Sequence, residues 1–311
     1  MTKHKPSDDL FDPRDGDPAI RTHRLDLGRK PFEPARTNYF SVYLVDSGSG
    51  TFWADASHFE FGPGFLLFFV PYQHIRFEPH DPVHAEVIQF HANFLCVETF
   101  HAEVGCSGVL FNDPYGIPVV KLEEQAKQEV VGLIDRIRTE QAGRDLAFNE
   151  VMLAHLKVLL ILATRLKSPR AVCGPGADLR HPLLADLRDL IEKNYRTLHS
   201  PADYAERLHV TAKTLGRTVR EHLGTTPTDL IRNRILIHAK WQLLHTLKPV
   251  KEVARELGFA DELYFSRLFK KATGQSPTFF REFETEIRGG SNLSMPSGHA
   301  PILLSTSPAN T

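Results

Sequence analysis

Cysteine is scarce in this chain of 311 residues, and the few cysteines form no recognisable pattern. There are three, Cys96, Cys106 and Cys173, so any disulfide scheme leaves one unpaired. No Cys-x-x-Cys pair is present. A disulfide framework, a cysteine zinc site and a thioredoxin-type redox motif are therefore all disfavoured.

Long apolar runs are missing as well. Residues 158–163 form one of the longest, far below the ~20 residues that a membrane span needs. The start of the chain is rich in aspartate and has no apolar stretch of the secretory-signal kind. These absences predict a protein of the reducing cytoplasm that does not enter membranes.

Net charge is nearly absent, at -1, but it is unevenly distributed. Residues 1–178 hold 18 Lys and Arg against 24 Asp and Glu, residues 179–288 hold 19 against 14, and residues 289–311 hold none. An acidic front and a basic back indicate that only the back meets a polyanion such as nucleic acid. Solvated helices often carry a similar excess, so charge alone leaves this open.

The front of the chain has the pattern of short strands separated by turns. Aromatic and β-branched runs occupy residues 39–45, 51–53, 65–70, 73–78 and 84–91, with glycine-rich turns at 46–50 and 62–64. Such spacing favours a sandwich or barrel. Residues 1–20 are acidic and aperiodic, which predicts a disordered arm.

Helical spacing begins after Pro118, with apolar residues three and four apart over 122–137 and again over 145–167. The second helix is apolar around much of its circumference. Burial inside its own domain and a homodimer interface are both consistent with that. Residues 168–181 read as a linker, and residues 289–311 as a disordered tail.

The C-terminal region contains an internal repeat. Ala205 and Leu208 recur 49 positions later, whereas Leu215, Arg217, Val219, Gly224 and Pro227 have counterparts 50 positions later. Each copy predicts a short helix, a tight turn, a longer helix that ends at glycine, and a third helix that begins with proline. Two helices joined by a short turn form a helix-turn-helix unit.

A purely structural repeat of helical hairpins is the alternative to DNA binding, and it predicts helices without a basic face. The second helix of each copy instead carries three basic residues, either Lys213, Arg217 and Arg220 or Arg267, Lys270 and Lys271. The repeat and its charge together favour double-stranded DNA as the partner.

The second copy carries a longer signature. Residues 253–277 read VARELGFADELYFSRLFKKATGQSP, followed by Phe279-Phe-Arg281. Over residues 182–284 the chain resembles the DNA-binding domain of the AraC/XylS family of bacterial transcription regulators. Its front also resembles the family's cupin-type effector domain, at residues 48–50, 61–64, 68–74, 88–94 and 105–112.

The predicted fold is multidomain α+β. A cupin-like β-barrel with two following helices occupies residues 21–167, between the arm (1–20) and the linker (168–181). An all-α domain of two helix-turn-helix units joined by a long helix occupies residues 182–288, before the tail (289–311). A nucleoid-associated activator is implied by the resemblance, with RNA polymerase as a further partner. The apolar helix over residues 145–167 is the predicted interface of a homodimer.

The second helix of each unit is expected in the major groove, with its early residues near base edges. Arg217 can pair with guanine, Glu262 with cytosine, and Leu263 can touch a thymine methyl group. Arg267 belongs to the same outward-facing set, and its loss is expected to lower specific affinity. For Arg267 a structural salt bridge to a neighbouring helix is the alternative. Gly216 lies where family members often carry a base-reading side chain. The full predicted DNA-binding set is Lys213, Thr214, Arg217, Arg220, Glu262, Leu263, Ser266, Arg267, Lys270 and Lys271.

The front domain is expected to bind a small effector of unknown identity. The candidate effector residues are Tyr43, Trp53, Tyr72, His74, Gln89 and His91. A metal-dependent cupin enzyme is one alternative, because His74, His80, His84, Glu86 and His91 lie close in sequence. Their spacing is a poor substitute for the usual His-x-His pair, so no metal, cofactor or catalytic residue is predicted. A constitutive regulator whose cupin domain only dimerises is the other alternative.

Overall fold

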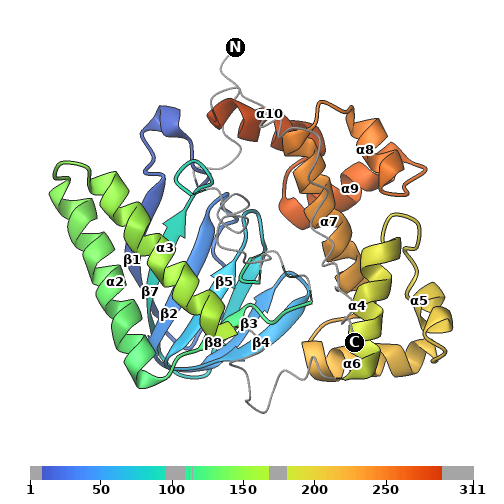
Figure 1. The fold of residues 1–311 in the computed structure, drawn as a ribbon, viewed down its shortest axis with the longest axis horizontal. Coiled ribbons are helices and arrows are strands. Elements are labelled where there is room, and N and C mark those ends of the chain that lie inside the picture. The colour runs from blue at the N-terminus through green and yellow to red at the C-terminus, as the bar shows by residue number, and fades with distance from the viewer. Residues whose placement is uncertain (1–8, 96–108, 112, 114, 168–180, 289–311) are drawn as a thin grey trace, which may run out of the picture.

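The computed structural model describes residues 9–95, 109–111, 113, 115–167 and 181–288. The predicted tail, most of the predicted linker, and all three cysteines lie outside these residues. A sheet-rich part is followed by a helical part, as the sequence predicts (Figure 1). Among the described residues, no helix is long and apolar enough to cross a membrane.

The predicted cupin-like domain takes the form of two facing antiparallel sheets. The larger has the strand order β1-β7-β2-β5-β8 and the smaller β4-β3-β6. The strands are β1 (Ile20–Leu27), β2 (Phe40–Ser47), β3 (Gly50–Ala54), β4 (Ser57–Phe61), β5 (Phe65–Phe69), β6 (Ile75–Pro79), β7 (Val83–Phe90) and β8 (Val119–Lys121).

The larger sheet is buried on both faces, and alternate side chains along each strand enter different core layers. On β2, Val42 and Leu44 join a cluster with the following helices, whereas Tyr43 and Val45 join a cluster between the two sheets. Successive side chains of a strand point to opposite faces, so an unbroken apolar run supplies both layers. The smaller sheet contributes mainly aromatic rings, such as Phe52, to the layer between the sheets.

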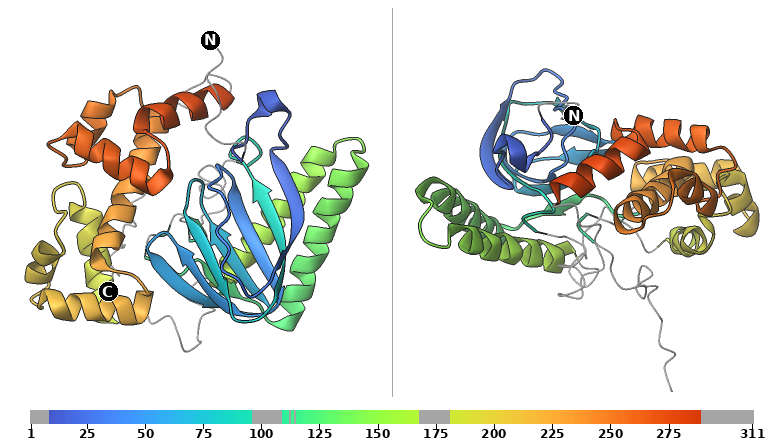
Figure 2. Two further views of the ribbon diagram at one scale, coloured as in Figure 1. Left: turned by 180° about the vertical axis from the view of Figure 1, so that it is seen from behind. Right: turned by 90° about the horizontal axis from the view of Figure 1, so that it is seen from above.

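Two long helices, α2 (Glu124–Gly143) and α3 (Phe148–Lys167), cover the other face of the larger sheet (Figures 1 and 2). The predicted helix over 145–167 begins three residues late. Arg144 and Ala147 adopt positive φ angles of 51° and 61°, and such left-handed residues interrupt a right-handed helix.

The start of the chain differs from the prediction of a disordered arm. Within residues 9–20 lies a 3-10 helix, Pro13–Asp15, and the preceding Leu10 and Phe11 are only 1% and 2% exposed. Phe11 packs against Tyr39 and His91, far along the chain, so its order comes from tertiary contacts that local composition does not reveal. Strands β1, β4 and β8 are also absent from the sequence-based assignment.

Seven helices form the described C-terminal part, and the long helix α7 lies between the two helix-turn-helix units (Figure 1). They are α4 (Pro182–Asn194), α5 (Pro201–Arg207), α6 (Ala212–Leu223), α7 (Pro227–His245), α8 (Val250–Glu256), α9 (Glu262–Thr273) and α10 (Pro277–Ile287).

The internal repeat is confirmed by these bounds. Helix α8 follows α5 by 49 positions, and α9 and α10 follow α6 and α7 by 50. Gly224 and Gly274 end the longer helices in left-handed conformations, at φ angles of 61° and 81°. Thr226 and Ser276 cap the helices that follow through their side-chain oxygens.

Candidate nucleic-acid interface

Helices α6 and α9 are the second helices of the two units, and each begins at a side-chain cap. Thr211 Oγ1 accepts a hydrogen bond from the Thr214 amide at 3.1 Å, and Asp261 Oδ1 accepts one from the Leu263 amide at 2.8 Å. The caps fix where each helix starts. They therefore fix which residues occupy the first turns, where base-reading side chains are expected.

The inner faces of both helices form core, as predicted. Leu215 and Val219 of α6 are 0% exposed, and so are Phe265 and Phe269 of α9. Phe259, before α9, is 7% exposed and also confirmed as core. Burial of this face leaves the opposite face of each helix to solvent.

On α6 the solvent face is basic. Lys213, Arg217 and Arg220 are exposed, and the side chain of Arg217 is 71% exposed. Thr214 is half-buried in the capping turn. A Cβ atom added to Gly216 would meet no atom within 4 Å, so the absence of a side chain there leaves an open surface between the basic residues.

On α9 the solvent face combines an apolar tip with basic residues. Leu263 is 69% exposed and the side chain of Arg267 is 72% exposed. Glu262 and Ser266 are half-buried, whereas Lys270 and Lys271 near the end of the helix are exposed.

Tyr264 is an exposed aromatic residue beside this predicted set on α9. It is 52% exposed and is absent from the set derived from sequence. Its neighbour Phe265 is buried. Two adjacent aromatic residues in a helix are easily both assigned to the core, although the helical period places them on different faces.

Both candidate arginines make only long, exposed ion pairs. Arg217 Nε lies 3.9 Å from Glu221 Oε1, and Arg267 Nη2 lies 3.8 Å from Asp261 Oδ2. The partner of Arg267 is thus the cap of its own helix rather than the neighbouring helix considered from sequence. Exposed pairs of this kind contribute about 0–1 kcal/mol, so DNA can replace them at little cost.

The sheet part contacts the opposite ends of the same two helices. The His58 amide donates to the carbonyl of Gly224, after α6, at 3.3 Å. Arg36 Nη1 donates to the carbonyl of Lys271, in the last turn of α9, also at 3.3 Å. The first turns of α6 and α9 remain exposed when the two parts are docked in this way.

Helix α10 forms the most buried contact between the two parts. Glu284 is 2% exposed, and its Oε1 accepts hydrogen bonds from the Tyr72 hydroxyl and from Asn38 Nδ2. His91 Nε2 lies 3.4 Å from Glu284 Oε2, and Arg288 Nη2 lies 3.2 Å from the same oxygen. Burial alone would raise the pKa of Glu284, but His91, Arg288 and Tyr72 together lower it to about 2.

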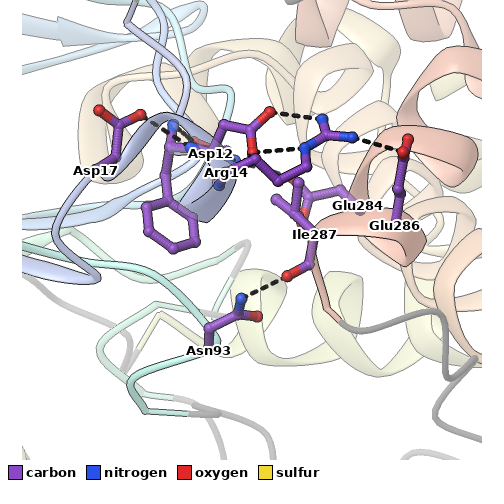
Figure 3. Close-up of polar contacts among 9 residues, drawn as sticks. Asp12, Arg14, Asp17, Asn93, Glu284, Glu286 and Ile287 are labelled. Carbon is purple, nitrogen blue, oxygen red and sulfur yellow. Dashed lines mark hydrogen bonds and ion pairs between the residues drawn. The ribbon is translucent and has the colours of Figure 1, made fainter. Parts of the chain in front are cut away.

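Two further contacts extend this docking along α10 (Figure 3). Arg14 Nη1 pairs with Glu286 Oε1 at 2.5 Å, and its other nitrogens bind Asp12. Asn93 Nδ2 donates to the carbonyl of Ile287 at 2.7 Å. The ordered segment near residue 12 therefore touches the last helix of the C-terminal part.

The six candidate effector residues do not form one site. Tyr43 and Gln89 line a cavity of about 350 Å³ in the sheet part. Tyr72 and His91 instead contact Glu284. The side chain of His74 lies 3.8 Å from Glu33, and the guanidinium of Arg76 lies over the Trp53 ring.

The residues considered for metal binding also lie apart. His84 pairs with Asp26, Glu86 with Arg24 and Arg138, and His91 with Glu284. Over the residues that the structure describes, no three or more His, Cys, Asp or Glu side chains are grouped as a metal site requires.

Comparisons with known proteins agree with the class of protein that this geometry defines, a helix-turn-helix protein. The helix-turn-helix domain family matches residues 204–282. The match includes the whole of α6, α7, α8 and α9, and so it spans the second helices of both units.

Two relatives are similar over about half of this chain. The transcriptional activator RhaS of Escherichia fergusonii is 30% identical over 178 residues, which cover 56% of this chain and 59% of RhaS. The activator RhaR of an Enterobacter species is 27% identical over 171 residues, which cover 55% and 60% of the two chains. The similarity thus spans about three-fifths of each relative's length.

Solved structures to which this chain is similar include ToxT of Vibrio cholerae and the C-terminal domain of the response regulator AraT of Geobacillus stearothermophilus. ToxT is 12% identical with a TM-score of 0.36, and the match covers 85% of this chain and 98% of ToxT. The AraT domain is 32% identical with a TM-score of 0.32, and the match covers 32% of this chain and 84% of that domain.

Proposed function

We propose that this protein is a sequence-specific DNA-binding transcription regulator rather than an enzyme. The observation that carries the proposal is the duplicated unit, whose two second helices each expose basic side chains opposite a buried inner face. Two such helices at the ends of one long helix suit adjacent segments of the major groove.

The predicted DNA-binding residues divide into two roles. Arg217, Arg267, Glu262 and Leu263 read base edges from the first turns, and Thr214 and Ser266 support them there. Lys213, Arg220, Lys270 and Lys271 contact phosphates and set the register without specifying sequence. The outcome of binding is activation, through contact with RNA polymerase, since both relatives compared above are named as activators.

We also propose that a small molecule in the sheet part controls DNA binding. The cavity of about 350 Å³ supports this, as does the docking of that part onto both second helices. A ligand that prefers one docked arrangement over another shifts the population of DNA-binding states.

A homodimer through α3 completes the proposal. Val158 of α3 is 42% exposed although the helix is otherwise rich in buried leucine. Val158→Asp is expected to convert a dimer into a monomer in sedimentation experiments. Leu247→Asp, at an 86% exposed leucine between α7 and α8, is the control and should leave the dimer intact.

The test of DNA recognition is selection of fragmented genomic DNA by the purified protein at two salt concentrations, followed by sequencing. Enrichment of a shared motif at both concentrations is expected. Uniform binding that disappears at higher salt would mean phosphate contact alone, and it would overturn the assignment of base-reading residues.

A further inference from the structure

The cavity of the sheet part lies at one end of the space between the two sheets. The inward-facing side chains of β1 and β2 form one wall, with Arg21 and His23 on β1 and Ser41 and Tyr43 on β2. Its volume of about 350 Å³ equals that of about a dozen waters. A small metabolite fits this space.

Arg21 is the cation of this wall, and it is held in place without a carboxylate. Its Nε donates to Gln89 Oε1 at 2.8 Å, and its guanidinium lies 4.4 Å from the centre of the Tyr39 ring. Gln89 is oriented in turn, because its Nε2 donates to Ser41 Oγ at 3.1 Å. Within the described residues Arg21 makes no ion pair and bonds to Gln89 through its Nε, so its two terminal nitrogens can bind a further partner.

The other arginine of β1 provides a contrast. Arg24 points to the opposite face of the strand, and its Nε lies 2.7 Å from Glu86 Oε1. Arg24 therefore has a carboxylate partner within the protein itself. Arg21 instead pairs with a neutral amide beside a cavity, so its guanidinium can still bind an anion there.

The remaining lining favours an anion of single charge with an apolar body. Partial desolvation lowers the pKa of His23, and the charge of Arg21 lowers it further, so a second cation in this wall is disfavoured. Burial raises the pKa of Tyr43 to about 12, which keeps its hydroxyl a neutral donor. Asp9 also lines the cavity and disfavours a second negative charge, while Leu25, Phe32 and Ile75 supply apolar surface.

We propose that the cavity binds a small monocarboxylate whose carboxylate group is held by the guanidinium of Arg21 and whose apolar body lies against Leu25, Phe32 and Ile75. The planar fork of arginine matches a carboxylate with two parallel hydrogen bonds. This inference rests on the proposed function, since it names the chemical class of the regulator's effector.

The same cavity reaches the second helix-turn-helix unit through one loop. Phe32, Ala35 and Thr37 line the cavity, and the loop is fixed at both ends, since Phe32 exchanges backbone hydrogen bonds with Phe77 and the Thr37 carbonyl accepts from the Tyr72 amide. Between them, Arg36 donates to the carbonyl of Lys271 in α9. A ligand that shifts this loop shifts the end of a DNA-reading helix.

The experiment measures thermal shifts and calorimetric binding with a set of monocarboxylic acids of up to about a dozen non-hydrogen atoms. Each acid is paired with its primary amide, which has the same shape and no charge. The wild-type protein is expected to bind a subset of the acids and not the matched amides. Arg21→Gln should weaken that binding by about 10- to 100-fold, the size expected for a charge-assisted hydrogen bond.

Two further variants keep the test independent of folding. Arg21→Lys retains the positive charge but loses the planar guanidinium that makes two parallel hydrogen bonds, so it should bind the acids with intermediate affinity. Arg24→Gln removes a charge from the outer face of the same strand and should bind like the wild type. Equal binding of acids and amides, acid binding that survives Arg21→Gln, or no acid binding at all would each overturn the proposal.

Failure here is distinguishable from failure of the proposed function. DNA selection by the protein without added ligand tests the regulator independently of the cavity. A protein that selects a DNA motif but binds no acid remains a regulator with a different effector. One that binds acids through Arg21 but selects no DNA motif overturns the DNA assignment and leaves the cavity assignment standing.

Discussion

The Tyr72 hydroxyl donates a hydrogen bond to the Glu284 carboxylate, across 212 positions of the chain and between its two parts. Both side chains are buried, at 1% and 2% exposure. Tyr72 itself adopts a positive φ of 64°, and its ring packs edge-on against Phe280 of α10. The sheet part therefore presents a strained, fully buried tyrosine to a carboxylate of the last helix, and this contact anchors the docking.

Replacement of Glu284 by glutamine should destabilise the docked protein by about 1.5–3 kcal/mol, because several donors converge on a buried charged acceptor. Thermal unfolding followed by calorimetry measures the loss. Glu286→Gln on the same helix is the matched control, since its pair with Arg14 is half-exposed and contributes about 0–1 kcal/mol. Equal effects of the two variants would contradict the anchoring role of Glu284.

Stability is expected to fall as the pH decreases from about 6.5 to about 4, because of His238. Burial, with the charge of Arg234, lowers the pKa of this histidine to about 4. The unfolded chain therefore binds a proton in this window that the folded chain does not, which favours unfolding by up to about 3 kcal/mol. Urea unfolding at several pH values measures the slope.

His238→Gln should flatten this slope, since glutamine does not titrate and can still bond to the Tyr195 hydroxyl, which lies 2.7 Å from His238 Nδ1. His23→Gln is the control on the sheet part: the pKa of His23 is also lowered, but its side chain is exposed. A slope unchanged by His238→Gln would show that other groups carry the pH dependence.

Two glycines of the first unit should respond to alanine in opposite directions. Gly216 lies inside α6 with open space around it, so Gly216→Ala should stabilise the protein by about 0.5–1 kcal/mol. Gly224 has a φ of 61°, and a Cβ atom there would lie 2.6 Å from the His58 carbonyl oxygen, so Gly224→Ala should destabilise it by more than about 1 kcal/mol. Denaturant midpoints distinguish the two, and a stabilising Gly224→Ala would contradict the close approach of the sheet part.

Arg267→Ala should lower the affinity for a selected operator by about 1–3 kcal/mol and relax specificity at one base pair. Lys271→Ala is the comparison, since removal of a phosphate-binding cation should weaken binding to all sequences alike and reduce the salt slope by about one. Fluorescence anisotropy with operator and scrambled duplexes at two salt concentrations measures both. Operator binding unchanged by Arg267→Ala would remove Arg267 from the base-reading set.

The C-terminal architecture can be predicted from sequence because its signals are local. The ends of the second helix of each unit, and the start of the helix that follows, are marked by side-chain caps or glycines, such as Thr226 and Gly224, and the repeat shows the same pattern twice. Core positions such as Phe265 follow from helical spacing once those ends are known.

The sheet part is harder to predict because its decisive contacts are distant in sequence. Strand β1 alternates Arg21, His23 and Leu25 toward a partly polar cavity, so it lacks the apolar alternation that identifies a strand. The sequence suggests an effector site for His91 and Tyr72, yet both contact Glu284, and neither spacing nor composition indicates that partner.

The 50-residue offset between the two units has a consequence for the last helix of the repeat. Helix α10 is the copy of α7, and position 284 corresponds to position 234, where the buried Arg234 pairs with Glu192 of α4. The first copy of this helix leads on to another unit, whereas the second copy has no later unit among the described helices to join. The second copy thus ends on a helix whose charged, inward-facing position, Glu284, fastens the sheet part to the helical part instead of pairing within the repeat.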